Sequence, residues 1–158
     1  MSSNTDITPV TIQRVADAMS GFDVQLDVHE GNDVASANLN GLPVTFAVLG
    51  SVALVRADTV TEQTLADADP TLYLASNQVN CVSFGARASV MDRGENLIVR
   101  TEREFSIAAG LTDAQLSATL RDAVDAVLAT QDGVKVAAEE LAELRAAVEK
   151  QLDEHQNS

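Results

Sequence analysis

Residues that could carry acid, base or nucleophilic chemistry are sparse in this sequence of 158 residues. Asp27, His29 and Glu30 stand together on a predicted strand and its turn, and an imidazole beside carboxylates could exchange protons near neutral pH. No recognisable nucleophile motif accompanies them. We therefore favour a solvated surface histidine. A small-molecule hydrolase or transferase with an acid/base site at these three residues is kept as the alternative.

The single cysteine, Cys81, limits the redox chemistry of the chain. One thiol forms no intrachain disulfide and cannot build a zinc site from cysteines, and it fits a reducing cytoplasm. Cys81 falls near the C-terminal end of a predicted helix, where the helix dipole disfavours a thiolate. We predict a buried, unreactive side chain.

Motifs for metal and phosphate binding do not occur in the sequence. Asp67 and Asp69 could hold a cation loosely, but no window has the ligand spacing of an EF-hand. Neither a P-loop nor a glycine-rich dinucleotide motif is found. We therefore expect no catalytic residue, no metal and no cofactor.

The chain is strongly acidic, which narrows its partners. It holds 24 Asp and Glu against 10 Lys and Arg, a formal charge of −14. Binding to a phosphate backbone or to an anionic membrane needs a basic surface, so we expect neither as a partner. Shielding of a basic partner is a minor interpretation. Residues 34–55 carry no charge, but Asn, Gly and Pro interrupt them, which predicts strands and not a membrane span.

Arginines gather on one predicted hairpin in the second half of the chain. Arg87 and Arg100 could bind an acidic segment of a protein partner, since guanidinium groups bind carboxylates with two hydrogen bonds. The favoured interpretation is pairing across the hairpin. The arginines are Arg87, Arg93, Arg100 and Arg103, and the glutamates available to them are Glu95, Glu102 and Glu104.

The elements that must position these residues follow from the hydrophobic spacing. The first half predicts a helix from a Thr8 cap to Gly21, and then a meander of about four strands that begins with residues 24–28. Asn40-Gly41 is a strong hairpin signal, because both positions tolerate a positive φ. The fourth strand is predicted over residues 52–56, with a connection after it.

The second half predicts a short helix over residues 70–81 with Asp69 as its cap, and then strands over 84–91 and 96–105. Thr112 and Gln115 form a capping box for a long helix. We expect Gly133 to end that helix. In the short helix, the apolar residues available for packing are Leu72, Leu74 and Val79.

A final helix over residues 136–154 is polar apart from a narrow apolar seam. Such a seam indicates a partner helix or a loose contact with its own domain, so a homodimer is one interpretation. We also predict that the chain still folds when it is truncated after Gly133. The seam consists of Leu141, Leu144, Val148 and Leu152. The candidate partner-binding residues are Arg87, Arg100, Leu141, Leu144 and Val148.

The predicted order is α-β-β-β-β-α-β-β-α plus a C-terminal helix. Strands linked by hairpins favour an antiparallel sheet flanked by helices, which is the α+β class. We expect a single domain over residues 8–133. Residues 134–158 are expected to form an amphipathic helix with a frayed tail.

Residues 72–128 resemble the YbjN family of bacterial sensory transduction regulators. The likeness lies in Asn77-Gln78-Val79-Asn80 at a helix end, in the two strands after it, and in Gly110-Leu111-Thr112 before the long helix. The resemblance implies a fold similar to type III secretion chaperones, which are often dimeric, bind extended client segments and are not enzymes. Asn77 and Asn80 are expected to hydrogen-bond the backbone. We therefore expect a non-enzymatic, cytoplasmic protein-binding or regulatory module.

Overall fold

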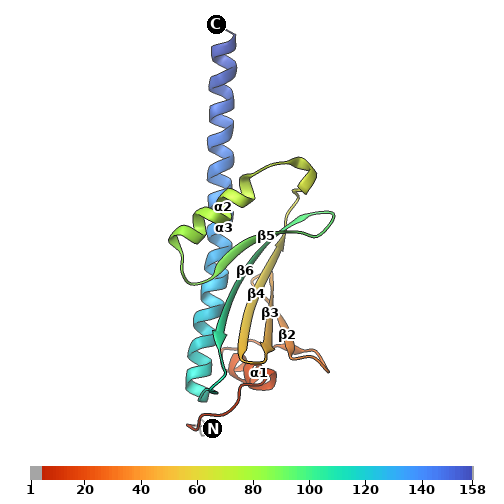
Figure 1. Ribbon diagram of the computed structural model, residues 1–158, viewed down its shortest axis with the longest axis vertical. Helices are drawn as coiled ribbons and strands as arrows, with labels where there is room; N and C mark the ends of the chain where they lie inside the picture. Colours follow the sequence, from red (N-terminus) through yellow and green to blue (C-terminus); the bar gives the residue numbers. More distant parts are fainter. Residues whose placement is uncertain (1–4, 158) are drawn as a thin grey trace.

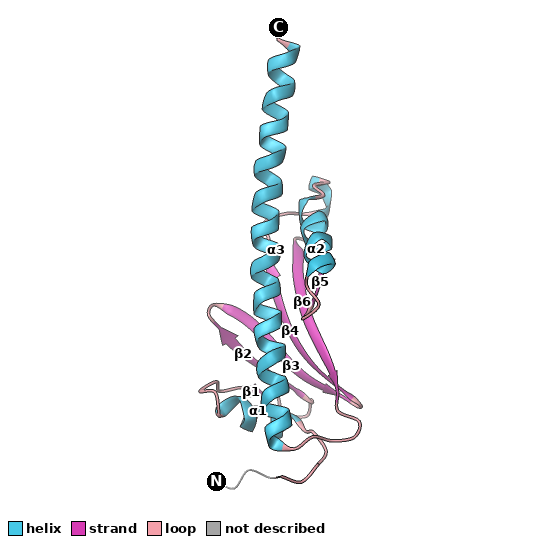
Figure 2. Cartoon of the chain, turned by 90° about the vertical axis from the view of Figure 1, so that its left-hand side faces the viewer, coloured by secondary structure: helices cyan, strands magenta, loops and turns pink. Residues whose placement is uncertain are grey.

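The computed structural model describes residues 5–157, which form one six-stranded antiparallel sheet, three α-helices and a short 3-10 helix. The strand order is β1-β2-β3-β4-β6-β5. The α-helices cover one face of the sheet, and α3 projects far beyond it (Figure 1, Figure 2). The predicted α+β class is confirmed. The elements are α1 (Ile12–Ser20), β1 (Asp27–Val28), β2 (Val34–Leu39), β3 (Leu42–Leu49), β4 (Val52–Val60), η1 (Leu65–Asp67), α2 (Thr71–Val82), β5 (Arg87–Asp92), β6 (Leu97–Ser106) and α3 (Asp113–Gln156).

Helix α1 begins later than predicted. Its N-cap is Thr11, whose side chain accepts a hydrogen bond from the N–H of Arg14 at 3.2 Å. Thr8 pairs instead with Leu111 through backbone hydrogen bonds of 3.0 and 3.3 Å, so the chain at Thr8 is extended and cannot start a helix. The apolar side of α1 is buried against the sheet as expected, and the helix ends before Gly21.

The meander of strands follows the prediction with two changes of length. Asn40 and Gly41 have φ angles of 55° and 86°, which confirms the predicted hairpin turn. Strand β1 is shorter than expected, because the N–H of Val24 donates to the carbonyl of Met19 at the end of α1. Strand β4 is longer than expected and carries Asp58 into the sheet.

Helix α2 packs on α3 and β5 with part of its predicted apolar set. Leu72 and Val79 are buried, but Leu74 is 52% exposed, and its predicted packing is wrong. Asp69 stabilises the start of the helix, since its carboxylate accepts hydrogen bonds from the N–H and hydroxyl of Thr71 at 2.9 and 2.6 Å. These bonds hold the pKa of Asp69 below its ordinary value.

Two predictions at the end of α2 are wrong. Cys81 is exposed and not buried, because it lies on the side of α2 that faces away from the buried residues Leu72 and Val79. Strand β5 begins at Arg87, because α2 runs on to Val82 and the next residues are needed to turn the chain. Phe84 lies in this turn and is 94% exposed.

Helix α3 is one continuous helix of 44 residues, so the predicted helix end at Gly133 is wrong. Its start is as predicted, with the capping box of Thr112 and Gln115. Gly133 lies where α3 crosses α2, and a Cβ there would be 3.6 Å from the methyl groups of Val79, an ordinary contact. Glycine costs a helix about 1 kcal/mol, which tertiary packing on both sides of it outweighs.

The packed part of α3 continues past Gly133. Val134 and Ala137 are buried, and Leu141 packs at the edge of the same apolar cluster. The predicted boundary between a domain over residues 8–133 and a separate helix over 134–158 therefore lies within α3 and not at a helix end. The expected frayed tail is helical as far as Gln156. Residue 158 lies outside the described residues. No described helix has an apolar stretch of the length that a bilayer crossing requires.

A buried glutamine fixes α3 against the centre of the sheet. The side-chain amide of Gln131 donates to the carbonyls of Ala57 on β4 and Val99 on β6, at 3.1 and 3.0 Å. Its oxygen accepts from the hydroxyl of Thr59 at 3.2 Å. A buried amide without these partners would be costly, so they specify one position of α3 along the strands.

Candidate functional site

The arginines of the β5–β6 hairpin are mostly engaged on the sheet face that no helix covers. Arg100 binds Asp58 on β4 with two hydrogen bonds of 2.7 Å, and its side chain is only 14% exposed. The hydrogen bonds from Arg100 hold the pKa of Asp58 below its ordinary value, although partial burial opposes them. Arg100 is therefore bound within the fold and is not presented to a partner.

Glu102 pairs with two further arginines of this face. It lies 2.9 Å from the guanidinium of Arg56 and 3.9 Å from that of Arg87. The Arg87–Glu102 pair lies within the hairpin, as favoured from the sequence, whereas Arg93 and Arg100 pair with Asp58 on β4, outside the hairpin, Arg93 at 3.9 Å. Arg87 has a loose ion pair and a 65% exposed side chain, so a partner could reach it. Arg103 points to the helix side of the sheet and binds Asp122 on α3 at 2.7 Å.

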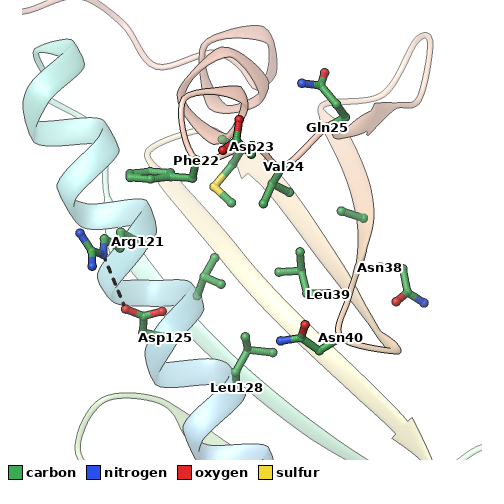
Figure 3. Close-up of a pocket in the computed structure, with 13 residues that line it drawn as sticks. Phe22, Asp23, Val24, Gln25, Asn38, Leu39, Asn40, Arg121, Asp125 and Leu128 are labelled. Carbon is green, nitrogen blue, oxygen red and sulfur yellow. Dashed lines mark ion pairs between the residues drawn. The ribbon is translucent and has the colours of Figure 1, made fainter.

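Asp27, His29 and Glu30 do not form a cavity. All three are exposed, and Nε2 of His29 lies 3.1 Å from the hydroxyl of Ser36 on the neighbouring strand. None of the three lines the hollow shown in Figure 3. Among residues 5–157, no three His, Cys, Asp or Glu side chains gather where they could hold a metal ion. The side chains of the alternative acid/base site thus point into solvent.

Asn80 has a positioning role at the edge of the sheet. Its amide donates to the carbonyl of Ala88 and accepts from the N–H of Ala88, both at 2.8 Å. These are the bonds that a neighbouring strand would make, so Asn80 ties the end of α2 to β5 and occupies part of the strand edge. The expected backbone hydrogen bonding is confirmed for Asn80, whereas Asn77 is exposed.

A hollow of about 680 Å³ lies between α3, the end of α1 and the β2–β3 hairpin (Figure 3). Val24 from the connection after α1, Leu39 from β2 and Leu128 from α3 point into it (Figure 3). Arg121 and Asp125 stand at its rim 4.0 Å apart, and both are exposed. No local pattern in the sequence marks this hollow, because its lining comes from segments far apart in the chain.

The last 15 residues of α3, 142–156, project from the body, and all of them are exposed. At a rise of 1.5 Å per residue this projecting segment is about 22 Å long. It carries three large apolar side chains, Leu144, Val148 and Leu152, which are 62%, 47% and 56% exposed. We call these three residues the α3 stripe. Leu141, at the base of the segment, packs on the body.

The α3 stripe continues a face of the helix that is buried lower down. Val134, Ala137 and Leu141 precede Leu144 and Val148 at spacings of three and four residues, so all five share one side of α3. The lower three pack in one apolar cluster with residues of α2 and the sheet, whereas the upper two lie outside that cluster and are 62% and 47% exposed. The packing surface of α3 thus extends beyond the body that it packs against.

Ion pairs steady the base of the projecting segment. Arg145 lies 3.3 Å from Asp69, next to the start of α2, and 3.1 Å from Glu149 one turn further along α3. Exposed pairs of this kind contribute only about 0.2–1 kcal/mol each. They orient the first turn of the projecting segment but do not cover the stripe.

These features define an α+β domain in which helices cover one face of an antiparallel sheet and one helix extends beyond it. The sequence matches the YbjN family, described as "Putative bacterial sensory transduction regulator", over residues 11–135. The chain therefore belongs to the YbjN family, as the sequence analysis expected. The match ends before the projecting segment.

Solved structures of other proteins are similar to this chain, and the first two below, with TM-scores above 0.5, share its fold. YbjN from E. coli, described as "a putative transcription regulator", has a TM-score of 0.68 at 12% identity, covering 85% of this chain and 96% of that one. An uncharacterized protein from Methanothermobacter thermautotrophicus has a TM-score of 0.52 at 10% identity, covering 80% and 97%. The type III secretion chaperone SycH from Yersinia pestis, in complex with a fragment of YscM2, has a TM-score of 0.42 at 11% identity, covering 75% and 97%. No curated protein matches the sequence.

Proposed function

We propose that this YbjN-family chain is a non-enzymatic regulatory module that binds another protein through the α3 stripe. The observation that carries the proposal is the unpartnered continuation of the α3 packing face over residues 142–156. An isolated helix of this length is marginal in water, and its apolar side chains gain from burial. Helices that lay an apolar face against a partner are a common mode of protein recognition.

The predicted partner-binding residues divide into three groups. Leu144 and Val148 are the centre of the proposed surface, and Leu141 supports it from the body. Arg87 is exposed and is kept as a proposed second contact. Arg100 is omitted from the proposed surface, because Asp58 already binds it.

The expected affinity is modest. Each of the three stripe side chains is about half exposed, so its full burial contributes roughly 1 kcal/mol. Association must also overcome the loss of rotational and translational freedom. The stripe alone therefore supports weak, reversible binding, which suits a regulator. A partner must make further contacts beside the stripe to bind more tightly. The reducing cytoplasm, inferred from the single cysteine, is the proposed compartment.

Site-specific photocrosslinking in the source bacterium tests this proposal. A photoreactive phenylalanine analogue at Val148 should form a discrete crosslink to a second protein. The same analogue at Val136, which is 52% exposed on another side of α3, is the matched control. Leu144→Glu should abolish the crosslink from Val148. Equal crosslinks from both positions, or none from Val148, would contradict a role for the stripe in binding.

A further inference from the structure

We propose that the hollow between α3, the end of α1 and the β2–β3 hairpin binds a small organic cation, an ammonium group carried on an apolar body. The proposal goes beyond protein binding through the α3 stripe and does not depend on it, because the hollow lies in the body of the fold. Three observations carry it: the size and apolar floor of the hollow, the unpaired carboxylate of Asp23 in its lining, and the exposed ring of Phe22 at the same end.

Short side chains on β2 leave room for the hollow. Ala35 and Ala37 face the helices, since they lie opposite Phe46 and Val44 of β3, which are both buried in the core. Ala37 lines the hollow, and its single methyl group fills little of the space above the sheet. The volume of about 680 Å³ lies within the range of small-molecule sites, about 300–1,000 Å³.

The floor and walls of the hollow are apolar. Met19 and Val124 line it and are buried parts of the hydrophobic core, so the floor is held by packing on the rest of the fold. Val24, Leu39 and Leu128 complete the apolar walls (Figure 3). A ligand with an apolar body therefore gains from burial here.

The charges of the lining favour a cation. Asp23, Arg121 and Asp125 are the charged residues that line the hollow. Arg121 and Asp125 pair with each other at 4.0 Å, so their charges offset one another. Within the part of the chain that the structure describes, Asp23 is exposed and makes neither an ion pair nor a side-chain hydrogen bond. The lining thus carries one uncompensated negative charge, which attracts a cationic ligand and repels an anionic one.

The backbone at Asp23 presents this carboxylate at a cost. Its φ angle is 60°, in the left-handed region, and the turn is held by a hydrogen bond from its N–H to the carbonyl of Ser20 at 3.1 Å. Glycine adopts this conformation without a steric cost, whereas a side chain brings one. The described residues gain no contact from the carboxylate in return. A cationic ligand would supply that contact.

Phe22 gives the same end of the hollow a second group that attracts cations. Its ring extends from the end of α1 toward α3, close to Asp23 (Figure 3), and is 39% exposed. The chain holds only four Phe, one Tyr and no Trp, so an exposed ring in the lining is uncommon here. The face of an aromatic ring attracts an ammonium group. The ammonium head would therefore lie by Phe22 and Asp23, with its apolar body along the walls.

NMR titration of the chain with three probes tests the proposal. The probes share a phenylbutyl body and differ only in the head group, which is an ammonium, a hydroxyl or a carboxylate. The ammonium should bind about fivefold more tightly than the alcohol and at least about tenfold more tightly than the carboxylate at low salt. The largest changes in amide shift should fall at Val24, Leu39 and Leu128.

Charge variants separate binding in the hollow from general attraction to an acidic chain. Asp23→Asn keeps a residue that tolerates the left-handed backbone, and it should weaken ammonium binding about fivefold while the alcohol binds as before. Asp33→Asn removes an equal charge from an exposed residue outside the hollow and is the matched control, with a change of less than about twofold. Arg121→Gln should strengthen ammonium binding, because it frees Asp125.

A filling variant tests the location independently of charge. Ala37→Leu places a larger side chain in the hollow and should weaken binding of all three probes by about tenfold. Ala118→Leu adds the same side chain at an exposed position of α3 outside the hollow, and it should leave binding unchanged.

Each outcome decides the proposal. An ammonium preference at the hollow that is lost in Asp23→Asn and kept in Asp33→Asn supports it. Equal binding of the three probes, tighter binding of the carboxylate, an equal loss in both charge variants, or no shift changes at the hollow would overturn it. A discrete protein crosslink from a photoreactive phenylalanine analogue at Phe22 would assign the hollow to a protein partner and would also overturn it.

Discussion

Truncation of α3 at two points tests where the folded body ends. One variant stops after Gly133, the helix end predicted from the sequence, and the other stops after Glu143. The first removes Val134 and Ala137, which are 2% and 7% exposed, together with Leu141 at the edge of the same cluster. Of the described residues, the second removes only exposed ones. The two variants therefore differ by the packed turns between them.

The magnitude follows from the buried side chains. A fully buried Val contributes about 1.5–3 kcal/mol and a buried Ala about 1 kcal/mol, and the half-buried Leu141 adds about 1 kcal/mol. The vacated space beside Leu72 and Leu97 adds a cavity cost. Truncation after Gly133 should thus cost about 4 kcal/mol, against a typical total of about 5–15 kcal/mol. Truncation after Glu143 should cost less than about 1 kcal/mol.

Urea unfolding followed by far-UV circular dichroism measures the difference. At about 2–4 °C per kcal/mol, the shorter chain should also melt about 8–16 °C below the full chain in calorimetry. Val134→Ala in the full chain should reproduce about 2 kcal/mol of the loss. Equal unfolding midpoints for the two truncations would refute the packing described for α3 and restore the boundary at Gly133.

Three further predictions concern residues within the body. Asn80→Ala loses two hydrogen bonds to Ala88 and should lower the free energy of unfolding by about 1–3 kcal/mol in urea titrations, whereas an unchanged midpoint would contradict its positioning role. Gln131→Met keeps the volume but loses the bonds to both strands, and the same titration should show a loss of about 1–3 kcal/mol. The pKa of Asp58 is lowered in the folded chain, so its ionised form stabilises the fold at pH values above the unfolded-state pKa, and this stabilisation is lost as pH falls through the folded-state pKa. Asp58→Asn should therefore flatten the dependence of the unfolding free energy on pH below about pH 5. A dependence identical to that of the unmodified chain would contradict the pairing with Arg100.

Local signals gave the most accurate sequence predictions. The Asn40-Gly41 turn and the Thr112–Gln115 capping box both appear as expected, because each depends on backbone preferences within a few residues. The α3 stripe was also found from spacing alone, since residues three and four apart share a helix face. The order of the elements follows from hydrophobic spacing and turn signals, and the family resemblance is confirmed by the match over residues 11–135.

The errors arose where tertiary contacts outweigh local preference. The sequence predicts a helix end at Gly133. The helix continues there because Gly133 lies against Val79 of α2 and the next residue, Val134, is buried. Thr8 was expected to cap α1, but its pairing with Leu111, far along the chain, extends the backbone there. The hollow beside the β2–β3 hairpin had no local signal, because only the fold brings its lining together.

Amide hydrogen exchange of the projecting segment tests the central claim most directly. In the isolated chain at monomeric concentration, residues 142–156 should exchange rapidly, while α3 around Leu120 and Val127 is protected. Addition of a partner captured at Val148 should slow exchange in residues 142–156. Strong protection of this segment in the monomer alone, or no change on binding, would contradict the claim that the α3 stripe is an open surface for a protein partner.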